Sequence, residues 1–333
     1  MRLIKPPKTM SLFVGGLGAM LIAMSAAITT GVFAQDVYPS RIITLVVPFP
    51  AGSGTDLSAR MLAKDMAEAL GKSVVVENRP GANGSLGAQF VARARPDGYT
   101  LLVGAAATNA SNYAFYGDKI GYTRTSFDMV GGLGIVPMSL VVAGNAPWKN
   151  LGELIAEAKK SPDKFACGSG TTTAQVACEM FKLRAGIDVL NVPYKGTPPA
   201  MIDLAGGHVH FVFADGTSAA SLVEQRRLRV LATAANKRAP YWPDVPTFVE
   251  LGMSDLEISA WSAVFVPTGT PLAIQQKLNA VVRRSTESPV SVASRQRTGS
   301  LALTYTLDEA RRFVSSEIDR WARFVKESGV KLE

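Results

Sequence analysis

The sequence has 333 residues, of which 35 are Lys or Arg and 27 are Asp or Glu, so the formal net charge is +8 at pH 7. This surplus is modest and is spread among many acidic residues without a Lys/Arg block, which argues against nucleic acid as a partner. The length exceeds what one hydrophobic core usually serves, so two lobes are the default expectation.

The chain begins with the three parts of an export leader. Arg2, Lys5 and Lys8 form a basic start without any acid, residues 12–28 are apolar and uncharged, and Ala34 is the small residue that signal peptidase prefers. The pattern predicts a signal peptide over residues 1–34 with cleavage after Ala34, and an uncleaved membrane anchor is the alternative. Removing three basic residues would lower the net charge from +8 to +5.

Short β-like runs alternate with helical patterns after the leader, which predicts an α/β fold. A strand over residues 42–47 leads into the loop Pro48–Asp56 and an amphipathic helix that Gly71 ends. Further strands are predicted over residues 73–77, 100–104, 138–143, 164–167, 189–193 and 209–214. Helices are predicted over residues 151–160 with Asn150 as the cap, from Pro271, and after Thr306, which forms a capping box with Glu309.

Four loops share one design, in which a strand runs into a small polar loop and then into a helix. They are Pro48–Asp56, Gly81–Ser85, Ser169–Thr173 and Tyr194–Thr197. Helix N-termini attract anions through unpaired N–H groups and the helix dipole, and ligands of open α/β sheets bind where such termini gather. The four loops therefore predict two lobes that present their loops to one cleft.

Cys167 and Cys178 are the two cysteines of the sequence. In an exported protein an even count favours a disulfide, which would tie the strand before the Ser169 loop to the helix after it. Two buried free thiols remain the alternative, and no metal site is expected from two cysteines so spaced.

The two histidines, His208 and His210, would project to one side of a strand, and two ligands without an acidic or Cys companion are a poor metal site. The motifs Gly-x-Ser-x-Gly, His-Glu-x-x-His and Gly-x-x-x-x-Gly-Lys are absent. The sequence thus predicts no catalytic residues, metal or cofactor, although an exported α/β enzyme remains a competing class.

Several motifs resemble those of the Bug, or TctC-like, periplasmic solute receptors. The resemblance runs from about Tyr38 to Val330, and its motifs follow the family order: 46–60, 77–82, 192–200, 204–209 and 243–247. It implies a two-lobed type II periplasmic-binding-protein fold in which each lobe is a mixed, mainly parallel sheet flanked by helices. The ligand cleft would lie between the lobes.

The resemblance also implies a division into domains and a set of partners. Domain 1 would take residues 36–138 and 260–333, and the inserted domain 2 would take residues 139–259. The protein would lie in the periplasm, bind a small carboxylate, and serve the membrane components of a tripartite tricarboxylate transporter.

Ligand contacts in the first lobe are expected mainly from the loop Pro48–Asp56. Backbone N–H groups of this loop would bind one carboxylate, and the Thr55 hydroxyl would assist. These N–H groups belong to Ala51, Gly52, Ser53, Gly54 and Thr55. Asp56 would cap the helix or face a ligand amine, and Phe49 would cover the ligand or belong to the core. The family pattern adds Ser85 and Thr108, which as isolated residues are more often caps or turn formers.

Contacts in the second lobe are expected from three places. Hydroxyl and N–H groups would come from Ser169, Thr171, Thr172 and Thr173, and further amides from Gly196 and Thr197. Lys195 would pair with a carboxylate or stay solvated. Asp215 would accept a hydrogen bond from a ligand amine or order a water.

These expectations describe a monomeric, non-catalytic receptor for a small carboxylate, which could be a di- or tricarboxylate, an amino acid or an aromatic acid. A sensing accessory that contacts a membrane kinase is the alternative, because receptors for transport and for sensing share these sequence features.

Overall fold

The computed structural model of the protein describes residues 1–4, 38–162, 164–239 and 241–331. The predicted cleavage point after Ala34 lies outside these residues. The chain separates into the units Met1–Tyr38 and Pro39–Glu333, and the fold is that of the second unit. No helix among the described residues is long and apolar enough to cross a membrane.

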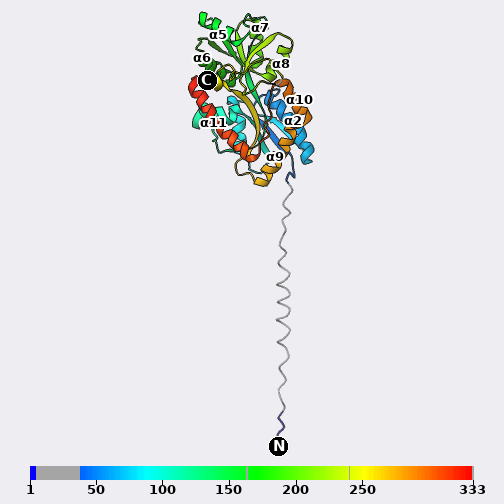
Figure 1. Cartoon of the computed structure of the whole chain (residues 1–333). Helices are drawn as coiled ribbons and strands as arrows, with labels where there is room; N and C mark the ends of the chain where they lie inside the picture. Colours follow the sequence, from blue (N-terminus) through cyan, green and yellow to red (C-terminus); the bar gives the residue numbers. More distant parts are fainter. Residues whose placement is uncertain (5–37, 163, 240, 332–333) are drawn as a thin grey trace. The chain divides into compact units, whose positions relative to one another are not determined.

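The first sheet has the strand order β2-β1-β3-β9-β4. β1 (Ile43–Val47) lies parallel to both β2 (Val74–Asn78) and β3 (Thr100–Ala105). β9 (Ser259–Pro267) pairs antiparallel with β3 on one side and with β4 (Phe127–Ala143) on the other. A strand from the end of the chain therefore completes a sheet that the beginning of the chain starts (Figure 1).

The second sheet repeats this strand order with the later strands, as β6-β5-β7-β4-β8. β5 (Ala166–Ser169) is parallel to β6 (Leu190–Pro193) and β7 (Phe211–Asp215). β4 pairs antiparallel with β7 and with β8 (Leu228–Thr233). Because β4 belongs to both sheets, it joins them into one continuous structure.

The sheets are flanked by helices in the order α2 to α11. Their bounds are α2 Gly54–Leu70, α3 Ser85–Ala92, α4 Asn112–Tyr116, α5 Leu151–Lys160, α6 Thr172–Ala185, α7 Thr197–Gly206, α8 Gly216–Glu224, α9 Leu272–Thr286, α10 Pro289–Thr298 and α11 Leu307–Ser328. Short helical turns lie at η1 Ala82–Gly84, η2 Ala107–Ser111, η3 Gly117–Ile120 and η4 Ser254–Leu256.

Local capping explains where several helices begin. Asn150 accepts a hydrogen bond from the Glu153 amide at the start of α5, and Thr306 and Glu309 form the predicted capping box of α11. Gly71 ends α2 in the left-handed conformation, as predicted. The sequence predictions for these three helices are thus confirmed.

The main hydrophobic core includes residues of α6 and α11. Phe181 of α6, Phe213 of β7 and Phe248 pack ring against ring, and Trp261 of β9 and Trp321 of α11 belong to the same cluster. Burying one such side chain contributes about 1.5 to 3 kcal/mol. A smaller cluster under α7 and α8 includes Val141 and Leu204.

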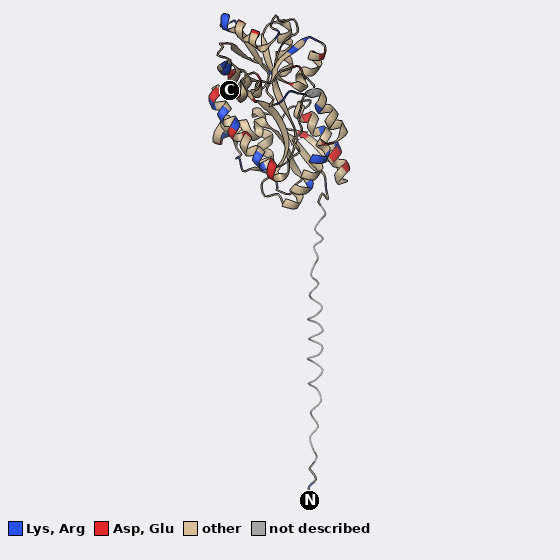
Figure 2. Ribbon diagram, viewed as in Figure 1, with Lys and Arg blue, Asp and Glu red and all other residues tan. Residues whose placement is uncertain are grey.

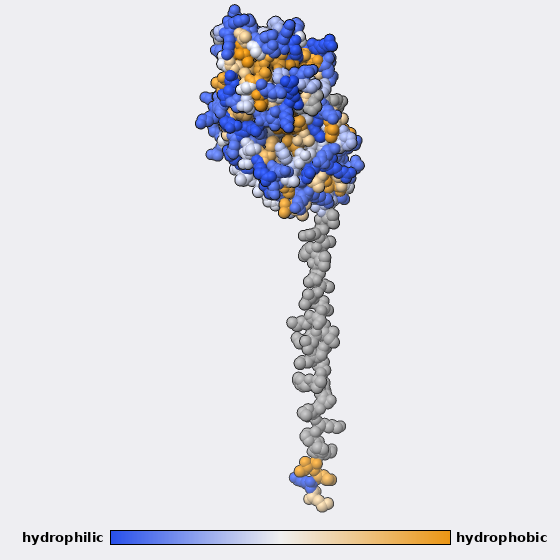
Figure 3. Space-filling model, in the orientation of Figure 1, coloured by the Kyte–Doolittle hydropathy of each residue, from blue (hydrophilic) through white to orange (hydrophobic). Residues whose placement is uncertain are grey.

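Charged side chains are distributed over the unit Pro39–Glu333 without a block of one sign. Figure 2 shows Lys and Arg interspersed with Asp and Glu along its helices. On the face shown in Figure 3, apolar residues form several separate patches between polar ones. An ionic cluster also joins two helices, because Arg184 of α6 pairs with Asp255 and with Glu327 of α11.

Candidate functional site

The carboxyl ends of the parallel strands in both sheets reach the same part of β4. Ala105, at the end of β3, pairs with Ser262 of β9, which in turn pairs with Gly134 of β4. Asp215, at the end of β7, pairs with Met138 of β4. Gly134 and Met138 are four residues apart, or about 13 Å along a strand. The loops that follow β3, β7 and the strands parallel to them therefore lie near the same stretch of β4, between Gly134 and Met138.

Hydrogen bonds within the loop Pro48–Asp56 fix the start of α2. The Ser53 side chain is the N-cap and accepts a hydrogen bond from the Asp56 amide. The buried Asp56 carboxylate accepts from the Gly52 amide at 2.8 Å, from Arg60 Nε at 3.0 Å and from Asn78 Nδ2 at 2.9 Å. The hydrogen bond from Arg60 contributes most to lowering the pKa of Asp56 to about 2, with help from the Gly52 amide and Asn78.

These bonds correct two predictions for this loop. The Gly52 amide donates to Asp56 and not outward, and the Asp56 carboxylate is turned into the protein, where no ligand amine would meet it. Asp56 instead braces the helix start. Thr55 is half-buried, whereas Ala51 and Gly54 are exposed.

Phe49 and Thr108 meet around Gly84, at the second predicted loop. Gly84 has a φ of +86°, and a Cβ added there would lie 2.6 Å from Thr108 Cγ2 and 3.3 Å from the Phe49 ring. Only glycine leaves room for this approach. Loops from three neighbouring strands are therefore packed together, and Phe49 is half-buried between them.

The Thr108 hydroxyl is used within its own turn, which corrects the prediction that it lines the cleft. Thr108 is fully buried, and its Oγ1 accepts from the Ala105 amide at 2.9 Å and donates to Asn109 Oδ1 at 2.7 Å. Its backbone oxygen accepts from the Tyr122 hydroxyl at 2.6 Å. Burial is the main cause that raises the pKa of Tyr122 to about 12.

Ser85 belongs to a buried network that holds an unusual turn. Ala82 and Asn83 have φ values of +47° and +50°, which cost about 1 to 3 kcal/mol each. Asn83 Nδ2 donates to Asn112 Oδ1 at 2.8 Å, while Asn112 Nδ2 donates to the Asn83 oxygen and to Ser85 Oγ, each at 3.1 Å. The Ser85 hydroxyl oxygen is thus engaged with Asn112, and the residue is buried.

The loops of the second sheet also lie against each other. A Cβ added at Gly170 would lie 2.4 Å from the Thr197 amide nitrogen and 2.5 Å from the Gly196 carbonyl carbon. Thr171 is the N-cap of α6, Gly196 is the N-cap of α7, and Thr172 and Thr197 are the first residues of those helices. The structure thus brings two predicted helix starts together. Thr173, in the first turn of α6, is half-buried.

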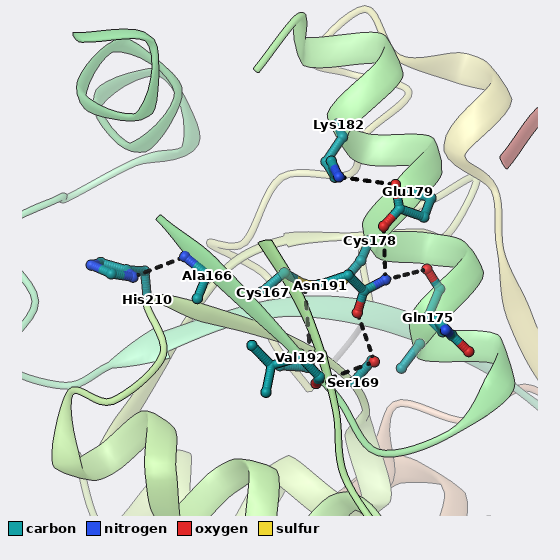
Figure 4. The surroundings of a disulfide bond; sticks show 12 residues. Ala166, Cys167, Ser169, Gln175, Cys178, Glu179, Lys182, Asn191, Val192 and His210 are labelled. Atoms are coloured by element: carbon teal, nitrogen blue, oxygen red, sulfur yellow. Dashed lines mark hydrogen bonds and ion pairs between the residues drawn. A yellow bond between two sulfur atoms is a disulfide. The ribbon is translucent and has the colours of Figure 1, made fainter. Parts of the chain in front are cut away.

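Three further predicted residues of the second lobe have other positions. Ser169 is buried and its hydroxyl donates to Asn191 Oδ1 at 2.8 Å, so it does not point toward a ligand (Figure 4). Asp215 caps α8, where its carboxylate accepts from the Ser218 amide and hydroxyl, each at 2.9 Å. Lys195 is exposed.

The predicted disulfide between Cys167 and Cys178 is confirmed. It joins β5 to α6 over a sequence separation of 11, with 6.3 Å between the Cα atoms. Both cysteines are fully buried. Figure 4 shows the polar network beside it, in which Asn191 Nδ2 donates to Glu179 Oε1 at 3.0 Å and to the Gln175 oxygen at 3.2 Å.

The strand predicted over residues 209–214 begins two residues later, as β7, so both histidines precede it. His210 Nδ1 accepts from the Ala166 amide at 3.0 Å, and its ring stacks on Phe165 with centroids 4.4 Å apart. Burial lowers the pKa of His210. Across the described ranges, no group of three or more His, Cys, Asp or Glu side chains could hold a metal ion.

Four residues that hydrogen-bond to the candidate site residues were not predicted from the sequence. They are Arg60 and Asn78, which donate to Asp56, Asn112, which donates to Ser85, and Tyr122, which donates to Thr108. Arg60 had a signal, because it follows Asp56 by four residues on one helix face, where opposite charges meet. Asn78 and Asn112 bridge segments 22 to 29 residues apart, and such contacts have no local pattern.

Comparisons with known proteins match this architecture over nearly the whole chain. A family model described as "Tripartite tricarboxylate transporter family receptor", TctC, matches residues 58–330. The protein BugT of Bordetella pertussis (strain Tohama I) is 36% identical over 302 residues, which cover 90% of this chain and 92% of BugT.

Two solved structures with bound acids are also similar. A protein of R. palustris with adipate has a TM-score of 0.80 and 33% identity, and the match covers 88% of this chain and 99% of that protein. MatC from Rhodopseudomonas palustris, with bound malate, has a TM-score of 0.75 and 32% identity, covering 86% and 100%. The observed fold is the two-lobed type II fold of periplasmic binding proteins, and the chain belongs to the Bug/TctC family of tripartite tricarboxylate transporter receptors.

Proposed function

We propose that the protein is a periplasmic, non-catalytic receptor that captures a small carboxylate between its two sheets. The observation that carries this proposal is the convergence of strand ends and helix N-termini from both sheets on one stretch of β4. The adipate and malate in similar structures support a dicarboxylate ligand. The captured acid would pass to the membrane components of a tripartite tricarboxylate transporter.

The corrected loop geometry indicates which groups would hold the ligand. The amides of Gly54 and Thr55 are the first two of α2, and a helix provides no internal acceptor for such amides. Together with the Thr55 hydroxyl they would bind one carboxylate. The amides of Thr172 and Thr173 at the start of α6, and of Thr197 at the start of α7, would bind the other end.

The remaining features of the proposal go beyond the family match. Residues 36–138 with 260–333 would form one lobe and residues 139–259 the other, and the protein would act as a monomer in transport, not with a sensor kinase. Export would remove residues 1–34. A mature N-terminus at Gln35, determined by sequencing the exported protein, would support that cleavage.

The proposal is tested by calorimetry of the chain without its leader against adipate, malate, amino acids and aromatic acids. Thr55→Val removes one hydroxyl at the proposed site and should weaken binding of the preferred acid about tenfold. Ser58→Ala, one turn later on α2, is the matched control and should bind as wild type. Absence of binding to every acid, or conversion of a bound acid to product, would contradict the proposed function.

A further inference from the structure

A cavity of about 100 Å³ lies over one face of the β4 and β8 pair, and its lining among the described residues includes none of the predicted ligand contacts. Ser139 and Thr233 are paired across these strands, and both line the cavity. Pro137 and Ala235 also line it, each two residues along from one of that pair, because alternate residues of a strand share a face.

Elements of both sheets close this cavity. Gly216 is the first residue of α8, and Gly299 is the C-cap of α10, which contacts α8. Leu301 bridges to Ile135 of β4. The cavity is therefore located where the two sheets meet.

Two polar groups that line the cavity, those of Thr233 and Lys237, have no acceptor among the described residues. The Thr233 hydroxyl is buried and has no hydrogen-bond partner among the described residues. Arg238 is neutralised by Glu250, to which its Nε donates at 3.0 and 3.1 Å. Lys237, by contrast, is exposed and has no ion-pair partner in the described part of the chain. Together with the Asn236 amide, these residues form a set of donors that an anion would satisfy.

Other residues of the lining are apolar. Ala235, Ala239, Trp242 and Leu301 contribute carbon surface to the cavity. Its volume of about 100 Å³ is smaller than that of an engineered cavity of about 150 Å³ that binds benzene. A suitable occupant is thus a short anion with a small apolar stem.

We propose that this cavity, which lies where the two sheets meet and beside the proposed ligand site, binds a short-chain monocarboxylate of two to four carbons. The carboxylate lies toward Thr233, Asn236 and Lys237, and the stem lies against Ala235 and Trp242. A carboxylate oxygen supplies the acceptor that the Thr233 hydroxyl lacks. The inference goes beyond the proposed function, because it assigns a second site with its own ligand class.

The test uses the chain without its leader, labelled with 5-fluorotryptophan and titrated with sodium butyrate by ¹⁹F NMR. Trp242→Phe identifies the Trp242 resonance, which should shift saturably. Thr233→Val and Lys237→Met should each weaken butyrate binding about tenfold, because each removes one partner of the carboxylate. Lys72→Met, at an exposed lysine after α2, is the matched control and should bind butyrate as wild type.

Any one of three outcomes would overturn the proposal. They are no saturable shift with butyrate, unchanged affinity in both variants, and a shift with inorganic phosphate alone. Calorimetry of the same variants with adipate and malate separates the two sites. Dicarboxylate binding without a butyrate response rejects only the second site, and the reverse result rejects only the proposed function.

Discussion

Asp56 shows how a buried charged residue can fix the start of a helix. A free carboxylate beside the proposed anion site would repel an acid. In the structure its charge is matched by Arg60 and by hydrogen bonds from Gly52 and Asn78. The loop therefore has a buried negative charge that holds its backbone at the start of α2.

Asp56→Asn should lower the free energy of unfolding by about 1 to 2 kcal/mol at pH 7, because it removes charge-assisted hydrogen bonds. The pKa of Asp56 in the folded protein, about 2, lies below the ordinary value of 3.8. The contribution of the Asp56 charge to the free energy of unfolding is therefore complete above pH 3.8. It is lost as the pH falls from about 4 to about 2. Urea unfolding of both proteins across this range is the measurement.

The control for this prediction is Asp319→Asn, because Asp319 pairs with Arg124 at the surface. Surface pairs contribute about 0 to 1 kcal/mol, so this variant should unfold nearly as wild type. A stability difference for Asp56→Asn that stays constant down to pH 2 would contradict the assigned role.

At the scale of elements, the sequence predicted helices better than it predicted one long strand. α5 and α11 begin at strong caps, and their predicted starts agree with the structure. Of β4, only the part from residue 138 was predicted, although the strand begins at Phe127. Gly131, Gly132 and Gly134 hide the first half, because glycine is depleted in strands.

This part of β4 is nevertheless extended because it pairs with β9. Its glycines are needed because the neighbouring segments leave no room for side chains. A Cβ at Gly132 would lie 2.2 Å from Leu303 Cβ, and one at Gly131 would lie 2.6 Å from Val282 Cγ1. These partners are more than 140 residues away in the sequence. A distant partner also explains why Ser169 was expected to face a ligand, because its partner Asn191 lies 22 residues away. Thr108 differs, because its hydroxyl is engaged by its neighbours Ala105 and Asn109.

The disulfide is the covalent tie between β5 and α6. A bridge that closes a loop with a sequence separation of 11 restricts the unfolded chain, and reduction should lower the free energy of unfolding by about 3 kcal/mol. Urea denaturation with and without reductant measures this change. The double variant Cys167→Ala/Cys178→Ala is the control, and its midpoint should not depend on reductant. Equal stability of reduced and oxidised wild type would refute the prediction.

At the scale of the whole molecule, the two sheets are joined through β4, which belongs to both, and α6 is joined to α11 by the ion pair of Arg184 with Glu327. A long shared strand permits bending, so a ligand that contacts both sheets would favour a closed form. The proposed lobes would then move as two bodies around Pro137 of β4 and Ala260 of β9. In the pairing of these two strands, Pro137 lies opposite Ser259, the residue before Ala260.

Small-angle X-ray scattering of the chain without its leader should therefore show a smaller radius of gyration with a saturating bound acid than without it. Thr55→Val at the same acid concentration is the control, and it should show a smaller decrease because its site is less occupied. Superimposable profiles for wild type with and without a bound acid would exclude closure.

The position of β9 has a consequence for how the chain folds. β9 lies between β3 and β4, yet it begins at Ser259, so the first sheet stays divided until more than three quarters of the chain has been made. Contacts between residues so far apart in sequence make folding slow. The strand order should therefore delay folding. We expect the newly made chain to remain unfolded long enough to pass through a narrow export channel.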